Sequence, residues 1–102
     1  MSYVVYQTRV DIMKTLENIQ TAFFEMIMKL EELSGIPTNT FLFHAKREEM
    51  EKELDEFIEE TDNDIAEVEK MEDEFNEDEQ ALYDDIIENQ RTALEKWADQ
   101  LF

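Results

Sequence analysis

Carboxylates are the most abundant groups able to do chemistry in this sequence, which has 28 Asp and Glu residues, 9 Lys and Arg residues and one His. Carboxylate oxygens bind cations such as Ca2+, and a suitably spaced pair can act as general acid and base. Asp62-Asn63-Asp64 begins like a calcium loop, but Ala66 and Glu67 stand where that loop needs a further ligand and its turn glycine. Acid pairs occur along the whole chain, so no single pair indicates catalysis.

The remaining chemistry-bearing residues form no recognisable site. His44 is the single histidine, and because the chain has no Cys a zinc site would need several carboxylate ligands. We expect His44, which follows three apolar residues, to be structural or on the surface. A single Gly excludes Gly-rich phosphate loops and most nucleophile elbows. We therefore expect no catalytic, cofactor-binding or metal-binding residues, and a protein that is not an enzyme.

Composition indicates one helical domain covering residues 1–102. Hydrophobic residues make up 42% of the chain, which is enough for a packed core, and 102 residues fit one domain. One Gly and one Pro leave almost none of the turn residues that a β-sandwich or barrel requires. The predicted fold class is all-α, an antiparallel three-helix bundle of the coiled-coil type.

The first predicted helix covers residues 8–34. Its apolar residues recur at alternating spacings of four and three, a heptad pattern that marks one face of a helix. These residues are Ile12, Leu16, Ile19, Phe23, Met26, Leu30 and Leu33. A wider stripe predicts contact with two neighbouring helices. The residues that widen it are Met13, Phe24, Ile27 and Met28.

Both ends of this helix carry further signals. Gly35 is expected to close it in the left-handed conformation, and Pro37 cannot continue it. Residues 2–6 (Ser-Tyr-Val-Val-Tyr) are β-prone and precede the helix. We expect them to form an N-terminal arm that packs on the bundle or on a second subunit.

The second predicted helix covers residues 39–74. Residues 38–40 (Thr-Asn-Thr) offer N-cap oxygens at its start. Residues 61–64 are poor helix formers whose side chains compete for backbone hydrogen bonds. A kink at 61–64 therefore stays open, although we expect one continuous helix.

The third predicted helix covers residues 77–101. Asn76 and Glu79 have the spacing of a capping box at its start. Apolar residues at heptad spacing then predict its buried face, which consists of Tyr83, Ile87, Leu94, Trp97 and Leu101. The short connections between the three helices imply antiparallel neighbours.

Nearly all of the net charge lies in residues 48–79. The whole chain has a formal charge of −19, and this segment, with eighteen acids and two bases, contributes −16. As one straight helix it would span roughly 48 Å, or one net charge per ~3 Å, close to the ~3.4 Å between phosphates of one DNA strand. The partner-binding residues predicted from this density are Glu49, Glu53, Asp55, Glu56, Glu59, Glu60, Asp62, Asp64, Glu67, Glu69, Glu72, Asp73 and Glu74.

This charge predicts an acidic binding protein that occupies a basic, nucleic-acid-binding surface of another protein. Its sign repels DNA, RNA and anionic membranes, so we expect neither direct nucleic-acid binding nor membrane binding. In size and charge the chain resembles the small acidic nucleic-acid-mimicking inhibitors of phages and mobile elements, such as anti-restriction and anti-CRISPR proteins. The resemblance implies inhibition by competition for a basic cleft.

Two other interpretations stay open. A solvated, solubilising surface also explains the acidity. The heptad seams also suit a self-associating assembly, scaffold or chaperone-type protein, including a homodimer held by the N-terminal arm and the first helix. No apolar run approaches the roughly 18 residues of a membrane helix, and no signal-peptide pattern occurs. We therefore expect a cytoplasmic protein, in the host cytoplasm if it is viral.

Overall fold

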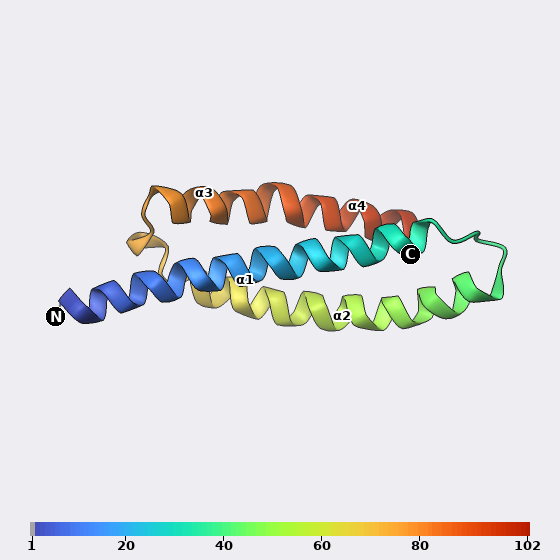
Figure 1. The fold of residues 1–102 in the computed structure, drawn as a ribbon, viewed down its shortest axis with the longest axis horizontal. Helices are drawn as coiled ribbons and strands as arrows, with labels where there is room; N and C mark the ends of the chain where they lie inside the picture. Colours follow the sequence, from blue (N-terminus) through green and yellow to red (C-terminus); the bar gives the residue numbers. More distant parts are fainter. Residues whose placement is uncertain (1) are drawn as a thin grey trace.

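The fold is an elongated antiparallel bundle of three helical rods. The computed structural model describes the backbone of residues 2–102 and the side chains of residues 12–102. The elements in chain order are α1 (Ser2–Ser34), α2 (Phe41–Glu69), the 3-10 helix η1 (Glu72–Glu74), α3 (Glu77–Asp85), the π-helical turn η2 (Ile86–Gln90) and α4 (Arg91–Leu101). α3, η2 and α4 follow one another without a break and form the third rod (Figure 1). No strand occurs in residues 2–102, and the predicted all-α bundle is confirmed.

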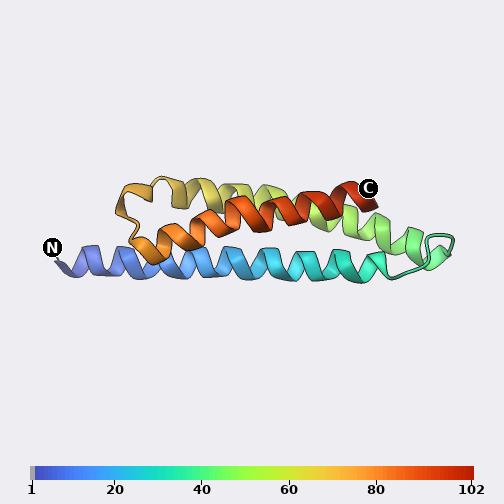
Figure 2. The same ribbon diagram turned by 90° about the horizontal axis from the view of Figure 1, so that it is seen from above.

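α1 is the rod on which the other two pack. It contacts α2 and also α3 and α4, whereas α2 and α4 make few direct contacts with each other. Figure 2 shows α2 and the third rod on the same side of α1. The molecule measures 60 × 19 × 16 Å, and its radius of gyration of 16.6 Å exceeds the roughly 13 Å of a compact domain of about 100 residues. The core is therefore a narrow line along the bundle.

The predicted apolar seam of α1, Ile12 to Leu33 at heptad spacing, supplies most of this core. All seven of its side chains are buried, with at most 6% of their surface exposed. Phe24 and Met28 do not widen the buried stripe as expected, because they are 61% and 46% exposed. Ile27 does widen the stripe as expected, because it is half-buried and packs against the core, and Met13 is also half-buried.

Contacts of individual residues explain where α2 begins and why it continues through residues 61–64. The Thr40 hydroxyl accepts a hydrogen bond of 3.2 Å from the backbone N–H of Phe43, so the helix starts at Phe41 and not at residue 39. α2 runs through residues 61–64 as one helix. Thr61 is only 5% exposed and anchors this segment of poor helix formers to the core, whereas Asp62, Asn63 and Asp64 are exposed.

The third rod begins with the predicted capping box and contains one turn that was not predicted. The side chain of Asn76 accepts from the backbone N–H of Glu79, and the Glu79 carboxylate accepts from that of Asn76, both at 2.8 Å. The π-helical turn η2 then adds one residue to the helical repeat. This addition makes Ile86 the buried residue, while Ile87, which the heptad pattern predicted, is half-buried.

Three predictions about helix ends are wrong. Residues 2–6 belong to the first turns of α1 and do not form an arm, and their side chains lie outside the described residues. Gly35 has no positive φ; instead the N–H groups of Gly35 and Ile36 donate to carbonyls three residues back, each at 3.1 Å. α2 ends at Glu69 and not at residue 74, because the chain turns there through η1.

None of the helices that the structure describes has an apolar stretch long enough to cross a membrane.

The π-helical turn leaves one polar group in an unfavourable position, and this generates a prediction. Gln90 Oε1 is buried and accepts no hydrogen bond within the described residues, although Nε2 donates to Asp85 at 3.3 Å. A buried acceptor without a donor costs about 1–3 kcal/mol. Gln90→Met should therefore raise the free energy of unfolding by about 1 kcal/mol in urea titrations. Gln100→Met, on the exposed side of α4, is the control and should change little; destabilisation by Gln90→Met would contradict the assignment.

Candidate protein-binding surface

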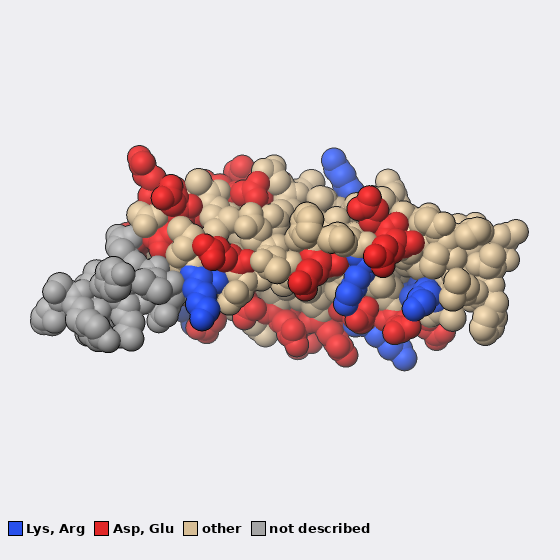
Figure 3. Space-filling view, in the orientation of Figure 1, with Lys and Arg blue, Asp and Glu red and all other residues tan. Residues whose placement is uncertain are grey.

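The solvent-facing side of α2 carries ten of the thirteen predicted binding residues. Nine of these ten side chains are exposed, and Glu53 is half-buried. The opposite side of the helix holds the buried residues Leu54, Thr61, Ile65 and Val68. Figure 3 shows acidic side chains along the edge of the molecule formed by α2 and near the start of α3. The acids therefore occupy most of the side of α2 that the core does not use.

Helical geometry divides these acids into two rows. Residues three or four apart lie above one another on a helix, so a series of such steps runs lengthwise along one flank. The row that we call the α1-side row consists of Glu49, Glu53, Glu56, Glu60, Asp64 and Glu67. The row that we call the α4-side row consists of Glu48, Glu51, Asp55, Glu59, Asp62 and Glu69. Lys52 and Asn63 fall between the two rows.

Contacts to the other rods fix the side on which each row lies. Lys29 of α1 forms an ion pair of 3.3 Å with Glu53, which places the α1-side row beside α1. Arg91 of α4 forms an ion pair of 3.5 Å with Asp62, which places the other row beside α4. Tyr83 of α3 donates a hydrogen bond of 2.5 Å to Glu69 at the end of the same row. Each row thus borders a different rod.

Tyr83 is a neutral donor in this arrangement. Burial raises the pKa of the Tyr83 phenol well above its ordinary range, and the hydrogen bond to the Glu69 carboxylate and the negative charge nearby raise it further. The phenol therefore keeps its proton and ties α3 to the end of α2 without adding to the charge of the surface.

Few of the predicted binding residues are neutralised by a cation. Among residues 12–102, ion pairs involve three of the thirteen, namely Glu53, Asp62 and Glu67. The Lys70–Glu67 pair, at 3.6 Å, is between two largely exposed side chains. Exposed pairs contribute little and are screened by salt. The surface therefore keeps nearly all of its negative charge.

The turn after α2 changes the geometry expected for the end of this surface. Glu72, Asp73 and Glu74 are exposed but form η1, so they do not extend the rows of α2. Residues 48–79 are thus not one straight helix of roughly 48 Å. Residues 48–69 span about 32 Å of α2 with twelve acids and one Lys, which is still about one net charge per 3 Å.

The structure also adds residues that the sequence reasoning missed. Glu48 and Glu51 are exposed and extend the α4-side row, and their three-and-four spacing to Asp55 would have identified them. Glu95 of α4 lies across from this row and forms an ion pair of 3.9 Å with Arg91. No sequence signal connects α4 to α2, because the register between two rods is set only by how both pack on α1.

The other residues that the sequence analysis considered lie in ordinary positions on the helices. His44 is exposed, with its ring 5.9 Å from that of Phe43. Asp62 and Asp64 both lie within α2 and not in a loop, so they do not form a calcium-binding loop. Trp97, expected in the core, is half-buried on α4.

The charge rows should cost stability, which generates a prediction. Glu60 has an acid four residues away on each side, Glu56 and Asp64, and like charges at this spacing repel. Glu60→Lys converts both repulsions into attractions and should raise the free energy of unfolding by about 1 kcal/mol at low ionic strength. The gain should shrink at high salt. Urea titrations at two salt concentrations measure both effects, and an unchanged stability would show that the rows carry no electrostatic cost.

No protein-family model, curated protein or solved structure matches this chain. The candidate surface is therefore described by its own geometry, two rows of carboxylates on one exposed helix face.

Proposed function

We propose that the chain is an acidic binding protein that uses α2 to occupy a basic, nucleic-acid-binding surface of another protein. The observation that carries the proposal is the pair of carboxylate rows on α2, of which few members are neutralised within the described residues. A solvated surface needs charge but has no need of acids ordered into two rows. Inhibitors of the anti-restriction or anti-CRISPR kind are the class of protein that would use such a surface.

The dimensions of α2 support this proposal. A helix with its side chains is about 10–12 Å across, and the major groove that separates two phosphate rows in B-DNA is about 12 Å wide. The rows lie on opposite flanks of α2, and the net charge along the helix repeats at about the phosphate spacing. Lys and Arg side chains arranged to grip two phosphate rows would therefore find carboxylates at comparable positions.

The mechanism is electrostatic and steric competition. The negative field of the rows accelerates encounter with a basic cleft, because opposite charges steer association. Once α2 lies in the cleft, a 60 Å rod excludes nucleic acid from the same surface. The interaction needs no bound cofactor and no covalent step.

Charge reversal tests this function. Proteins retained by the immobilised chain from a cell lysate are identified by mass spectrometry, and the purified partner is then titrated. Individual surface ion pairs contribute less than about 1 kcal/mol, so the test changes Glu49, Glu56, Glu60 and Glu67 to Lys together. Affinity should fall by about tenfold or more, since four losses of up to about 1 kcal/mol each add up and roughly 1.4 kcal/mol corresponds to a factor of ten.

The control reverses four exposed acids that lie outside both rows, Glu31, Asp84, Glu88 and Asp99. This variant has the same net charge as the first but should retain most of the affinity. Duplex DNA or RNA should compete with the chain for the partner, and affinity should fall steeply with salt. Equal losses in both variants, or binding indifferent to salt, would contradict the proposed function.

A second candidate function, self-association through α1, is favoured by a different observation. Phe24 and Met28 are exposed one turn apart on α1, which carries far less charge than α2. Two copies that meet along α1 would bury both side chains while keeping their acidic helices apart. A dimer of this kind would make the chain an assembly or scaffold protein.

Sedimentation at micromolar concentrations tests the second candidate. Wild-type protein should sediment as a dimer, and Phe24→Ser combined with Met28→Ser should give a monomer because the contact loses its apolar area. Phe41→Ser combined with Leu42→Ser removes two exposed apolar residues at the start of α2 and should leave the dimer intact. A wild-type monomer that persists on concentration rules this candidate out.

A further inference from the structure

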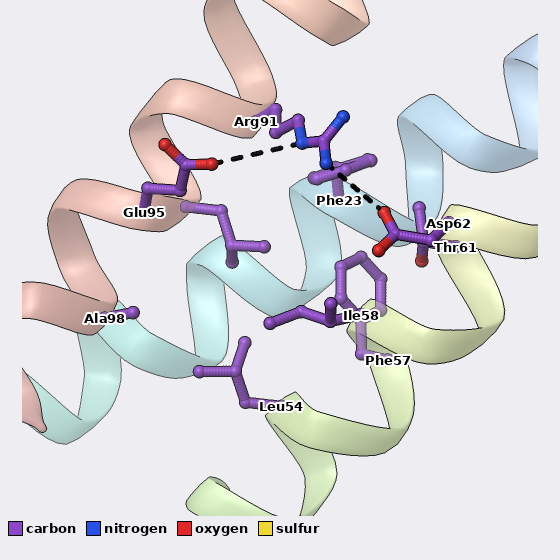
Figure 4. Close-up of a pocket in the computed structure, with 10 residues that line it drawn as sticks. Phe23, Leu54, Phe57, Ile58, Thr61, Asp62, Arg91, Glu95 and Ala98 are labelled. Carbon is purple, nitrogen blue, oxygen red and sulfur yellow. Dashed lines mark ion pairs between the residues drawn. The ribbon is translucent and has the colours of Figure 1, made fainter. Parts of the chain in front are cut away.

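A groove between α2 and α4 is left unfilled by the core. α2 and α4 both pack on α1 but make few contacts with each other, which leaves a hollow of about 100 Å3 between them. Phe23 of α1 lines its floor; Leu54, Phe57 and Ile58 of α2 form one wall, and Leu94 and Ala98 of α4 form the other (Figure 4). We call this hollow the α2–α4 groove.

Most of the residues that line the groove are apolar. The Phe23 and Phe57 rings meet edge to face, with centroids 5.2 Å apart and planes at 90°, a favourable arrangement for two aromatic rings. Ile58 is 42% exposed because no side chain of α4 covers it, and Ala98 is too small to reach across. An engineered apolar cavity of about 150 Å3 binds benzene, so this hollow has room for roughly one aliphatic side chain.

The rims of the groove are acidic. Asp62 on α2 and Glu95 on α4 line its opening and share a single cation, Arg91, at 3.5 and 3.9 Å (Figure 4). Asp55 and Glu59 continue the α4-side row along the same flank of α2. The opening therefore keeps a net negative charge, and an occupant must combine an apolar group with positive charges around it.

Another contact joins α2 to the end of α4, outside the lining of the groove. Arg47 of α2 donates from Nε to the carbonyl of Leu101 at 2.6 Å, and its guanidinium lies 5.5 Å from the centre of the Phe102 ring. A second copy of this chain is a poor occupant, since its own net charge is −19.

We propose that the α2–α4 groove is the docking site for a cationic amphipathic segment of the partner, which inserts one aliphatic side chain between α2 and α4. Its Lys and Arg side chains contact Asp55, Glu59, Asp62 and Glu95 on the two rims. The inference rests on the proposed function, because the carboxylate rows supply the attraction, and it adds the apolar anchor that selects one basic segment among many. Charge alone discriminates poorly between basic proteins, whereas a filled pocket adds a requirement for shape.

The probes are two helical Lys/Ala peptides of equal length and charge. They differ only at one central position, which is Leu in one peptide and Ala in the other. Fluorescence anisotropy with the full chain measures their affinities. The Leu peptide should bind about tenfold more tightly than the Ala peptide, because its side chain leaves water. Both affinities should fall with salt.

Three variants test whether the preference for the Leu peptide arises in the α2–α4 groove. Ala98→Leu fills the groove and should abolish the preference for Leu while leaving the affinity of the Ala peptide unchanged. Ile58→Ser changes an exposed wall residue with little effect on the core and should also reduce the preference. Ala45→Leu makes the same change as Ala98→Leu on the exposed side of α2 and should have no effect.

The outcomes distinguish failure of the groove inference from failure of the proposed acidic binding surface. Equal, salt-sensitive binding of both peptides overturns the groove inference and leaves the acidic surface supported. A Leu preference that is indifferent to salt supports the groove and contradicts the acidic surface as the source of attraction. A preference that survives both Ala98→Leu and Ile58→Ser, or no binding of either peptide, overturns the groove inference.

Discussion

Most of the packing contacts between the rods of this bundle are made against α1. Ile12, Leu16 and Leu30 are among the least exposed side chains, and the core residues of the other two rods, such as Val68 and Ile86, join the same cluster. Burial of one such side chain contributes roughly 1.5–3 kcal/mol, so the seam supplies a large share of the free energy that orders a chain of this size. α2 and α4 are neighbours only because both need the same seam.

This dependence explains how the chain tolerates so much negative charge. The repulsion on α2 is spread over exposed side chains in water, where each pair costs only about 0.2–0.5 kcal/mol. The apolar contacts on its inner side, at Leu54, Ile65 and Val68, oppose that cost. The acids and the stabilising apolar residues thus lie on opposite sides of one helix. Substitutions among the exposed acids therefore leave the apolar contacts of the core unchanged.

Sequence patterns predicted the parts of the fold that depend on one helix at a time. The α1 seam is correct at all seven positions, and the Asn76–Glu79 capping box forms as predicted, because periodicity and cap spacing are local properties. The π-helical turn at Ile86–Gln90 could not be predicted, since it arises where the third rod adjusts its register to α1. The end of α2 at Glu69 and the exposure of Phe24 likewise depend on where the neighbouring rods lie.

The same distinction applies to the binding surface. The acidic residues of α2 are visible in the sequence, and their three-and-four spacing orders them into rows. The groove is invisible there, because Phe23, Ile58 and Ala98 belong to three rods and become neighbours only after folding. The charge of α2 can therefore be counted from the sequence, whereas the groove depends on how the three rods pack.

The central place of α1 also has a consequence for synthesis of the chain. α1 precedes both of the rods that cover its seam, and α4 follows all the other helices in the sequence. Until α4 emerges, part of that seam stays accessible to other nascent chains, and exposed apolar surface of this kind drives aggregation. The acids of α2 are made in the interval, and their mutual repulsion keeps partly finished chains apart. The charge of α2 thereby also opposes aggregation while the chain folds.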